Sequence, residues 1–162
     1  MKPAEVSTPS DREVLVKRSF DAPVSLVWQA YTDPALMRRW LTAMPGWSMP
    51  VCEMTTNVGE KYRWRWRDES GQEFGFTGEM LEVALHSKIV HTQIYDPGGT
   101  DVASMGGEPS IITVTFNEID GITNVATSIK FASKADRDAA MSTGMTDGME
   151  MSYKQLDGVL VG

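Results

Sequence analysis

The sequence is short of the residues on which metal, redox and covalent chemistry depend. Its 162 residues include one cysteine, Cys52, and two histidines, His86 and His91. A single cysteine cannot form an internal disulfide, so nothing in the sequence points to an oxidising compartment. The two histidines have no cysteine or carboxylate cluster beside them and make a poor zinc site. We therefore expect no metal and no cofactor, and we interpret Cys52 as a small buried apolar residue.

Basic residues and long apolar runs are also scarce. Lys and Arg number 15 against 22 Asp and Glu, which gives a net charge of −7. A protein that binds duplex nucleic acid needs a basic face to displace counterions from the phosphates. No run approaches the ~20 apolar residues of a membrane span, and the polar N-terminus lacks the apolar core of a signal peptide. We expect a soluble, cytoplasmic protein that binds neither nucleic acid nor membranes.

Motifs that would name a reaction are missing too. The sequence has no GxGxxG, no Walker-type GxxxxGK[ST], no HExxH and no GxSxG. What is present is ordinary globular usage, with 41% hydrophobic and 23% charged residues. The length fits one domain. We expect residues 1–12 to form a flexible N-terminal tail and residues 13–162 to form a single domain.

The order of predicted elements indicates an α+β protein with an antiparallel sheet. Short connections between consecutive strands, such as Asp120-Gly121, are typical of hairpins. Two short helices follow the first strand, the second capped by Asp33-Pro34. A glycine-rich loop of unassigned role spans Asp96 to Ser110. The predicted strands are residues 13–20, 51–56, 60–68, 73–84, 88–95, 111–118 and 122–131.

Residues 60–68 carry the clearest pattern in the chain. Aromatic side chains occupy one parity and cations the other, and only a strand separates them in this way. We interpret the cationic row as a solvated outer face, and we attribute a shift of apolar parity in the next strand to a bulge near Gly78. The aromatic row is Tyr62, Trp64 and Trp66, joined by Phe74 and Phe76 on the next strand, and the cationic row is Lys61, Arg63, Arg65 and Arg67.

One long C-terminal helix is predicted from residue 133 or 134 onward. Met141, Met145 and Met149 step along one face of it. Gly144 and Gly148 each weaken a helix by ~1 kcal/mol relative to alanine, which suggests close approach to another element. The same glycines would leave space beside the sheet. Both the methionine row and the aromatic row fit either a plain core or the wall of a pocket.

Three segments carry a resemblance to a known family: REVLVKRSFDAPVSLVWQAYTDPALMRRWL, GEKYRWRWRDESGQEFGFTGEMLEV and GMTDGMEMSYKQLDGVL. Together they are similar to the AHSA-like branch of the START/polyketide-cyclase superfamily, which is named for a domain of a heat-shock-chaperone ATPase activator. The resemblance implies a helix-grip fold of the START/Bet v 1 type. We expect a curved antiparallel sheet of about six or seven strands around a long C-terminal helix, with a cavity between them.

From the predicted fold and cavity we expect the protein to bind a small hydrophobic or amphipathic molecule non-covalently. Tyr62, Tyr153 or His91 would orient the ligand. Two alternatives stay open: a cyclase- or hydrolase-type enzyme that uses His91 with a nearby carboxylate, and a protein-interaction module with a chaperone partner. Dimerisation through a sheet edge or face also stays open. The residues expected to bind the ligand are Trp40, Tyr62, Trp64, Trp66, Phe74, Phe76, His91, Phe116, Met145, Met149 and Tyr153.

Overall fold

The computed structural model describes residues 1–42, 45–96 and 108–161. Within these ranges the chain forms eight strands and four helices. The strands are β1 (Glu5–Ser7), β2 (Glu13–Phe20), β3 (Ser48–Glu53), β4 (Lys61–Arg67), β5 (Glu73–Ala84), β6 (Lys88–Asp96), β7 (Ser110–Ile119) and β8 (Ile122–Lys130). The helices are α1 (Val24–Thr32), α2 (Pro34–Trp40), α3 (Lys134–Ser142) and α4 (Met145–Val161).

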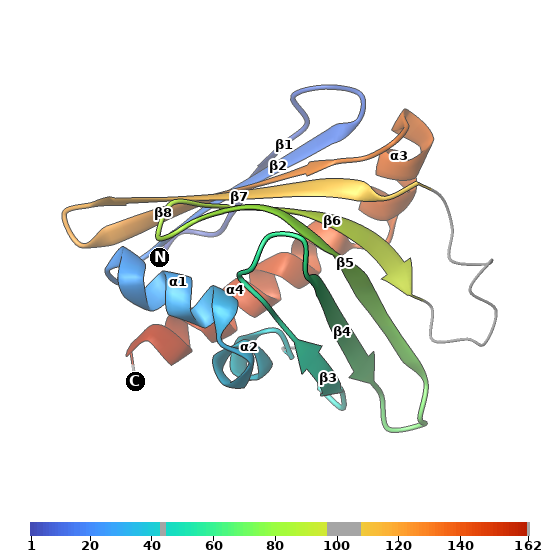
Figure 1. Cartoon of the computed structure of the whole chain (residues 1–162), viewed down its shortest axis with the longest axis horizontal. Helices are drawn as coiled ribbons and strands as arrows, with labels where there is room; N and C mark the ends of the chain where they lie inside the picture. The colour runs from blue at the N-terminus through green and yellow to red at the C-terminus, as the bar shows by residue number, and fades with distance from the viewer. Residues whose placement is uncertain (43–44, 97–107, 162) are drawn as a thin grey trace.

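All eight strands belong to one antiparallel sheet in the order β1-β2-β8-β7-β6-β5-β4-β3. The sheet is strongly curved, and α4 runs along its concave side together with α1 and α2 (Figure 1). A sheet that curves around one helix is the helix-grip architecture, so the predicted fold class is confirmed. The strand number is eight, against the six or seven expected.

The two predicted hairpins form because their turn residues satisfy the backbone locally. In the β4–β5 turn the Asp68 carboxylate accepts hydrogen bonds from the backbone N–H groups of Ser70 and Gln72, both at 2.9 Å. In the β7–β8 turn Asp120 and Gly121 have φ values of 53° and 80°. A two-residue turn with both residues in the left-handed region matches the twist of the strands it joins.

The additional strand comes from the segment expected to be a flexible tail. Residues Glu5 to Ser7 form β1, with Val6 opposite Val16 of β2. The Ala4 N–H also donates to Glu150 Oε1 of α4 at 2.8 Å. A three-residue polar strand leaves little signal in the sequence, because its hydrogen bonds come from the edge of an existing sheet and not from its own side chains.

The predicted long C-terminal helix is two helices, and Gly144 separates them. Gly144 has a φ of +80°, a conformation that favours glycine and ends α3. Its N–H donates to the Met141 carbonyl at 3.3 Å. Nothing lies within 4 Å of a Cβ placed on Gly148, so close approach does not explain this glycine. The expectation that it leaves space beside the sheet is the correct one.

Two glycines of β5 let side chains of β4 reach across to β6. Cβ atoms placed on Gly75 and Gly78 would lie 2.0 Å from backbone oxygens of Trp64 and Thr92, respectively. Gly78 therefore marks a close approach, and the register shift expected near it falls between Met80 and Glu82. Because Gly75 and Gly78 differ by three positions, they open paths on opposite faces of the sheet.

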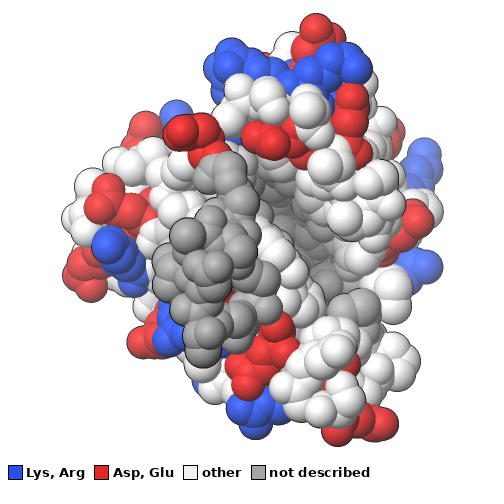
Figure 2. All heavy atoms as spheres, turned by 90° about the vertical axis from the view of Figure 1, so that its right-hand side faces the viewer, with Lys and Arg blue, Asp and Glu red and all other residues white. Residues whose placement is uncertain are grey.

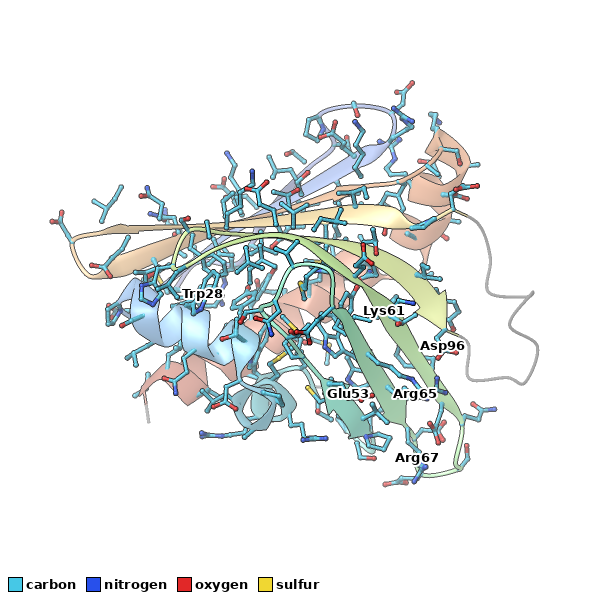
Figure 3. The ribbon with its side chains drawn as sticks, in the orientation of Figure 1. Trp28, Glu53, Lys61, Arg65, Arg67 and Asp96 are labelled. Atoms are coloured by element: carbon cyan, nitrogen blue, oxygen red, sulfur yellow. The ribbon has the colours of Figure 1, made fainter. Side chains whose placement is uncertain are left out.

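Arg65 uses the path over Gly75 on the outer face. It pairs with Gly75, which pairs in turn with Asp96 of β6. The Arg65 guanidinium bonds to Asp96 and, through Nε, to Glu73 at 3.0 Å. Figure 3 shows Arg65, Arg67 and Asp96 together on β4 and β6. The solvated outer face predicted for the cationic row is therefore wrong at Arg65, which is only 7% exposed.

A buried ion pair ties α4 to the sheet. The Arg18 side chain of β2 is 2% exposed, and its Nη1 and Nη2 donate to the two carboxylate oxygens of Asp157 at 2.8 Å. Glu150 accepts a further hydrogen bond from Nη2 at 3.2 Å. These contacts raise the pKa of the Arg18 guanidinium above its usual value. They fix the position of the helix that forms one wall of the site.

A cavity between the sheet and the C-terminal helix

An apolar cavity of about 950 Å³ lies between the sheet and α4. Its wall comes from the inward side chains of β4 to β8, from the short helices and from α3 and α4. The hollow opens on the face shown in Figure 2, where uncharged residues form its visible walls and charged residues lie around it. This volume falls at the upper end of the range for pockets that hold small organic molecules.

Nine of the eleven residues predicted to bind a ligand line this cavity. They are Trp40, Trp64, Trp66, Phe74, Phe76, His91, Met145, Met149 and Tyr153. The structure brings them together from β4, β5, β6, α2 and α4, although no more than three come from any one element. That they bind a ligand stays a prediction.

The other two predicted residues, Tyr62 and Phe116, lie behind the wall. The Phe116 ring packs between Trp28 and Tyr31, with ring centroids 5.2 Å from each. The Tyr62 ring is 1% exposed and reaches over Gly78 to donate its hydroxyl to the Thr92 carbonyl at 2.6 Å. Both belong to the packed core, and neither is among the residues that line the cavity.

Part of the wall was not predicted. Tyr31 of α1, Trp47 before β3 and Tyr95 of β6 add aromatic surface. Tyr31 follows Trp28 and Val27 at helical spacing, a signal that could have placed it on the inner face. Trp47 and Tyr95 carry no comparable signal, because a loop position and a strand end have no reliable periodicity.

The tryptophan N–H groups around the cavity differ in their hydrogen bonds. Trp40 Nε1 donates to the Ala30 carbonyl at 2.8 Å, and Trp66 Nε1 donates to the Leu41 carbonyl at 3.0 Å. The first bond joins α2 to α1, and the second ties the end of α2 to β4 of the sheet. Within the described residues, Trp64 Nε1 is buried and has no partner. An unpaired buried donor costs about 1–3 kcal/mol.

His91 of β6 is a buried titratable group in the wall, and its ring has two neighbours at hydrogen-bonding distance. Its Nδ1 lies 3.0 Å from both the Tyr62 hydroxyl oxygen and the Thr92 carbonyl oxygen. Burial lowers the pKa of the imidazole to about 4, and the hydrogen bond to Thr92 opposes part of this shift. The ring is therefore neutral at physiological pH.

Two tyrosines with buried hydroxyl groups, Tyr31 and Tyr153, also line the cavity. Burial, with a smaller contribution from the neighbouring Tyr153 hydroxyl, raises the pKa of Tyr31 well above its usual value. Burial also raises the pKa of Tyr153 to about 12. The Tyr31 hydroxyl has no partner at hydrogen-bonding geometry in the described part of the chain. Both hydroxyl groups are therefore neutral near pH 7.

The charged side chains in the described wall are all acidic. Among the described lining residues, Glu108 and Asp136 are the acidic ones, and none is a lysine or arginine. In residues 1–42, 45–96 and 108–161, no group of three or more His, Cys, Asp or Glu could hold a metal ion. Across the same ranges, none of the helices is long and apolar enough to span a membrane.

Fold and cavity together define a helix-grip protein of the START/polyketide-cyclase superfamily. The sequence profile of the "Activator of Hsp90 ATPase homolog 1-like protein" family matches residues 21–161, and the chain belongs to this family. A search of curated proteins finds no match to the chain.

Solved structures of several bacterial proteins have the same fold. A crystal structure of a Rhodobacter sphaeroides protein is 26% identical, with coverage of 99% of each chain and a TM-score of 0.89. A Mycobacterium smegmatis protein is 20% identical over 98% of this chain and 97% of its own, with a TM-score of 0.83. A Nitrosomonas europaea protein is also 20% identical, over 94% of this chain and 96% of its own, with a TM-score of 0.79.

Proposed function

We propose that the protein binds a small hydrophobic or amphipathic molecule non-covalently in the cavity between the sheet and α4. The observation that carries this proposal is the cavity itself, about 950 Å³ in volume and lined mainly by aromatic and aliphatic side chains. An unfilled apolar space of this size forfeits packing contacts that folded interiors normally make. A ligand would supply those contacts, at about 25 cal/mol for each Å² of apolar surface removed from water.

The geometry around His91 favours binding over the enzyme alternative. A cyclase or hydrolase would use His91 with a carboxylate, but the described hydrogen-bond partners of its ring are the Tyr62 hydroxyl and the Thr92 carbonyl. A chaperone partner and a homodimer stay predictions, as does the cytoplasmic location. The family description names an Hsp90 activator, but no feature of the described surface favours that contact.

Binding of the neutral fluorophore N-phenyl-1-naphthylamine tests the proposal. Its fluorescence rises in an apolar environment, and we expect saturable binding with one site per chain. Gly148→Phe places a ring in the open space beside α4 and should abolish the signal. Gly158→Phe is the matched control, because Gly158 is on the same helix but does not line the cavity.

Two results would contradict the proposal: no saturable binding to the folded wild-type protein, or equal binding to both phenylalanine variants. Native mass spectrometry of freshly purified protein is the complementary measurement. We expect a co-purifying small molecule with wild-type protein and its loss from the Gly148→Phe variant.

A further inference from the structure

The hydrogen bonds of His91 determine which of its ring nitrogens carries the proton. Nδ1 lies 3.0 Å from the Thr92 carbonyl oxygen, which can only accept a hydrogen bond. The same carbonyl also accepts from the Tyr62 hydroxyl at 2.6 Å. A lone pair on Nδ1 would repel the carbonyl oxygen, so the proton lies on Nδ1. In the neutral ring Nε2 then carries a lone pair and acts as an acceptor.

This acceptor belongs to a side chain that is buried and lines the cavity. His91 is 5% exposed, and its Nε2 makes no hydrogen bond to a described residue. Nδ1 faces the backbone of β6, so the opposite edge of the ring, with Nε2, remains for a ligand. The ring of Trp64 lies beside it, with its centroid 6.1 Å from that of His91.

We propose that the cavity selects a neutral ligand whose polar group donates a hydrogen bond to His91 Nε2, an alcohol or a phenol, over the corresponding carboxylate. The inference depends on the proposed binding function and names the class of its ligand. A hydroxyl group offers a proton to Nε2, as this acceptor requires.

A carboxylate fits this wall poorly for two reasons. Its oxygens only accept hydrogen bonds and would face the lone pair of Nε2. Its charge would also lose water without a cation to replace it, because the described lining has no lysine or arginine and contributes the carboxylates of Glu108 and Asp136. Burial of an unpaired charge is far more costly than burial of a hydroxyl group that finds a partner.

Three naphthalenes of similar size test the selection: 2-naphthol, 2-methoxynaphthalene and 2-naphthoate, titrated by calorimetry at pH 7. The ether carries a methyl group in place of the donor proton, and the acid carries a negatively charged carboxylate in place of the hydroxyl group. One net hydrogen bond corresponds to about a fivefold change in Kd. We expect naphthol to bind about fivefold more tightly than the ether, and naphthoate to bind more weakly than both.

Two variants test whether His91 causes the preference for naphthol over the ether. His91→Leu should remove the preference for naphthol over the ether. Gln93→Leu, the control, changes another polar residue of the cavity on the same strand and should retain the preference. If Gln93→Leu removes the preference and His91→Leu does not, the assignment to His91 is overturned. The wild-type order of the three ligands does not depend on either variant folding.

The failure of this inference differs from the failure of the proposed function. Binding of naphthoate as tightly as naphthol, or no difference between naphthol and the ether, overturns the selection and leaves the cavity as a binding site. No binding of any of the three naphthalenes overturns both.

Discussion

The glycines of the C-terminal helical region differ in what surrounds them, and alanine at each should therefore have a different effect. Gly144 has a φ of +80° between α3 and α4, whereas Gly148 and Gly158 lie within α4. A Cβ on Gly148 or Gly158 would have nothing within 4 Å. The helix propensity of alanine exceeds that of glycine by about 1 kcal/mol at an interior position.

We expect Gly148→Ala and Gly158→Ala each to raise the free energy of unfolding by about 1 kcal/mol. In a domain of this length that corresponds to an increase in Tm of about 2–4 °C. Gly144→Ala should lower the free energy of unfolding by about 1 kcal/mol, because an L-residue is strained in the left-handed region. Urea denaturation followed by circular dichroism measures all three values under the same conditions.

The sign of each effect is the test. A destabilising Gly148→Ala would mean that α4 packs closely against another element at this position, and the cavity as described would then be wrong. A stabilising Gly144→Ala would mean that α3 and α4 form one continuous helix. Gly158→Ala, distant from the cavity, calibrates the effect of helix propensity alone.

Three further predictions follow from buried groups. Arg18→Met should destabilise the protein by about 3 kcal/mol in urea denaturation, because it leaves the partly buried carboxylates of Glu150 and Asp157 without their cation. Lys134→Met breaks an exposed pair and should change stability by less than about 1 kcal/mol. His91 has a pKa of about 4 in the folded protein against 6.5 without the fold, so protonation favours the unfolded state. Burial of the neutral ring adds about 3 kcal/mol to the free energy of unfolding above pH 6.5, and this contribution is lost as the pH falls to about 4. In His91→Gln the free energy of unfolding should fall by about 3 kcal/mol less than in wild type over this pH range. Gly78→Ala should destabilise strongly, with a fall in thermal stability by calorimetry, because its Cβ would meet the Thr92 oxygen at 2.0 Å.

Each of these has a clear contrary result. Equal effects of Arg18→Met and Lys134→Met would show that burial of the Arg18 network adds nothing to its strength. Parallel pH profiles for wild type and His91→Gln would show that the imidazole is not held neutral by burial. A Gly78→Ala variant with wild-type stability would show that β5 and β6 can separate there at no cost.

Most of the secondary structure could be predicted from local patterns. The alternation at Tyr62, Trp64 and Trp66 predicted β4 and the inward face of its aromatic residues. Asp120-Gly121 predicted a hairpin, and Asp33 accepts the expected capping bond from the Ala35 N–H at 2.9 Å. These features depend on side-chain periodicity and on turn chemistry, both of which act between residues near in sequence.

Features that depend on distant partners could not be predicted. Arg65 looks like its exposed neighbours Arg63 and Arg67, and only its position over Gly75 and beside Asp96 makes it buried. Tyr62 has the same parity as Trp64, yet it packs behind the cavity wall because Gly78 opens a path to the Thr92 carbonyl. The sequence does not indicate which side chain will lie over Gly75 or over Gly78.

The local pattern of this chain was therefore sufficient for the strand and helix types, the aromatic composition of the inner face and the family. The curvature of the sheet and the position of α4 decided that a space of about 950 Å³ remains between them, and which residues face it. Volume is a difference between the space enclosed by the elements and the space their side chains fill. It depends on contacts between residues far apart in sequence, and no local pattern specifies them.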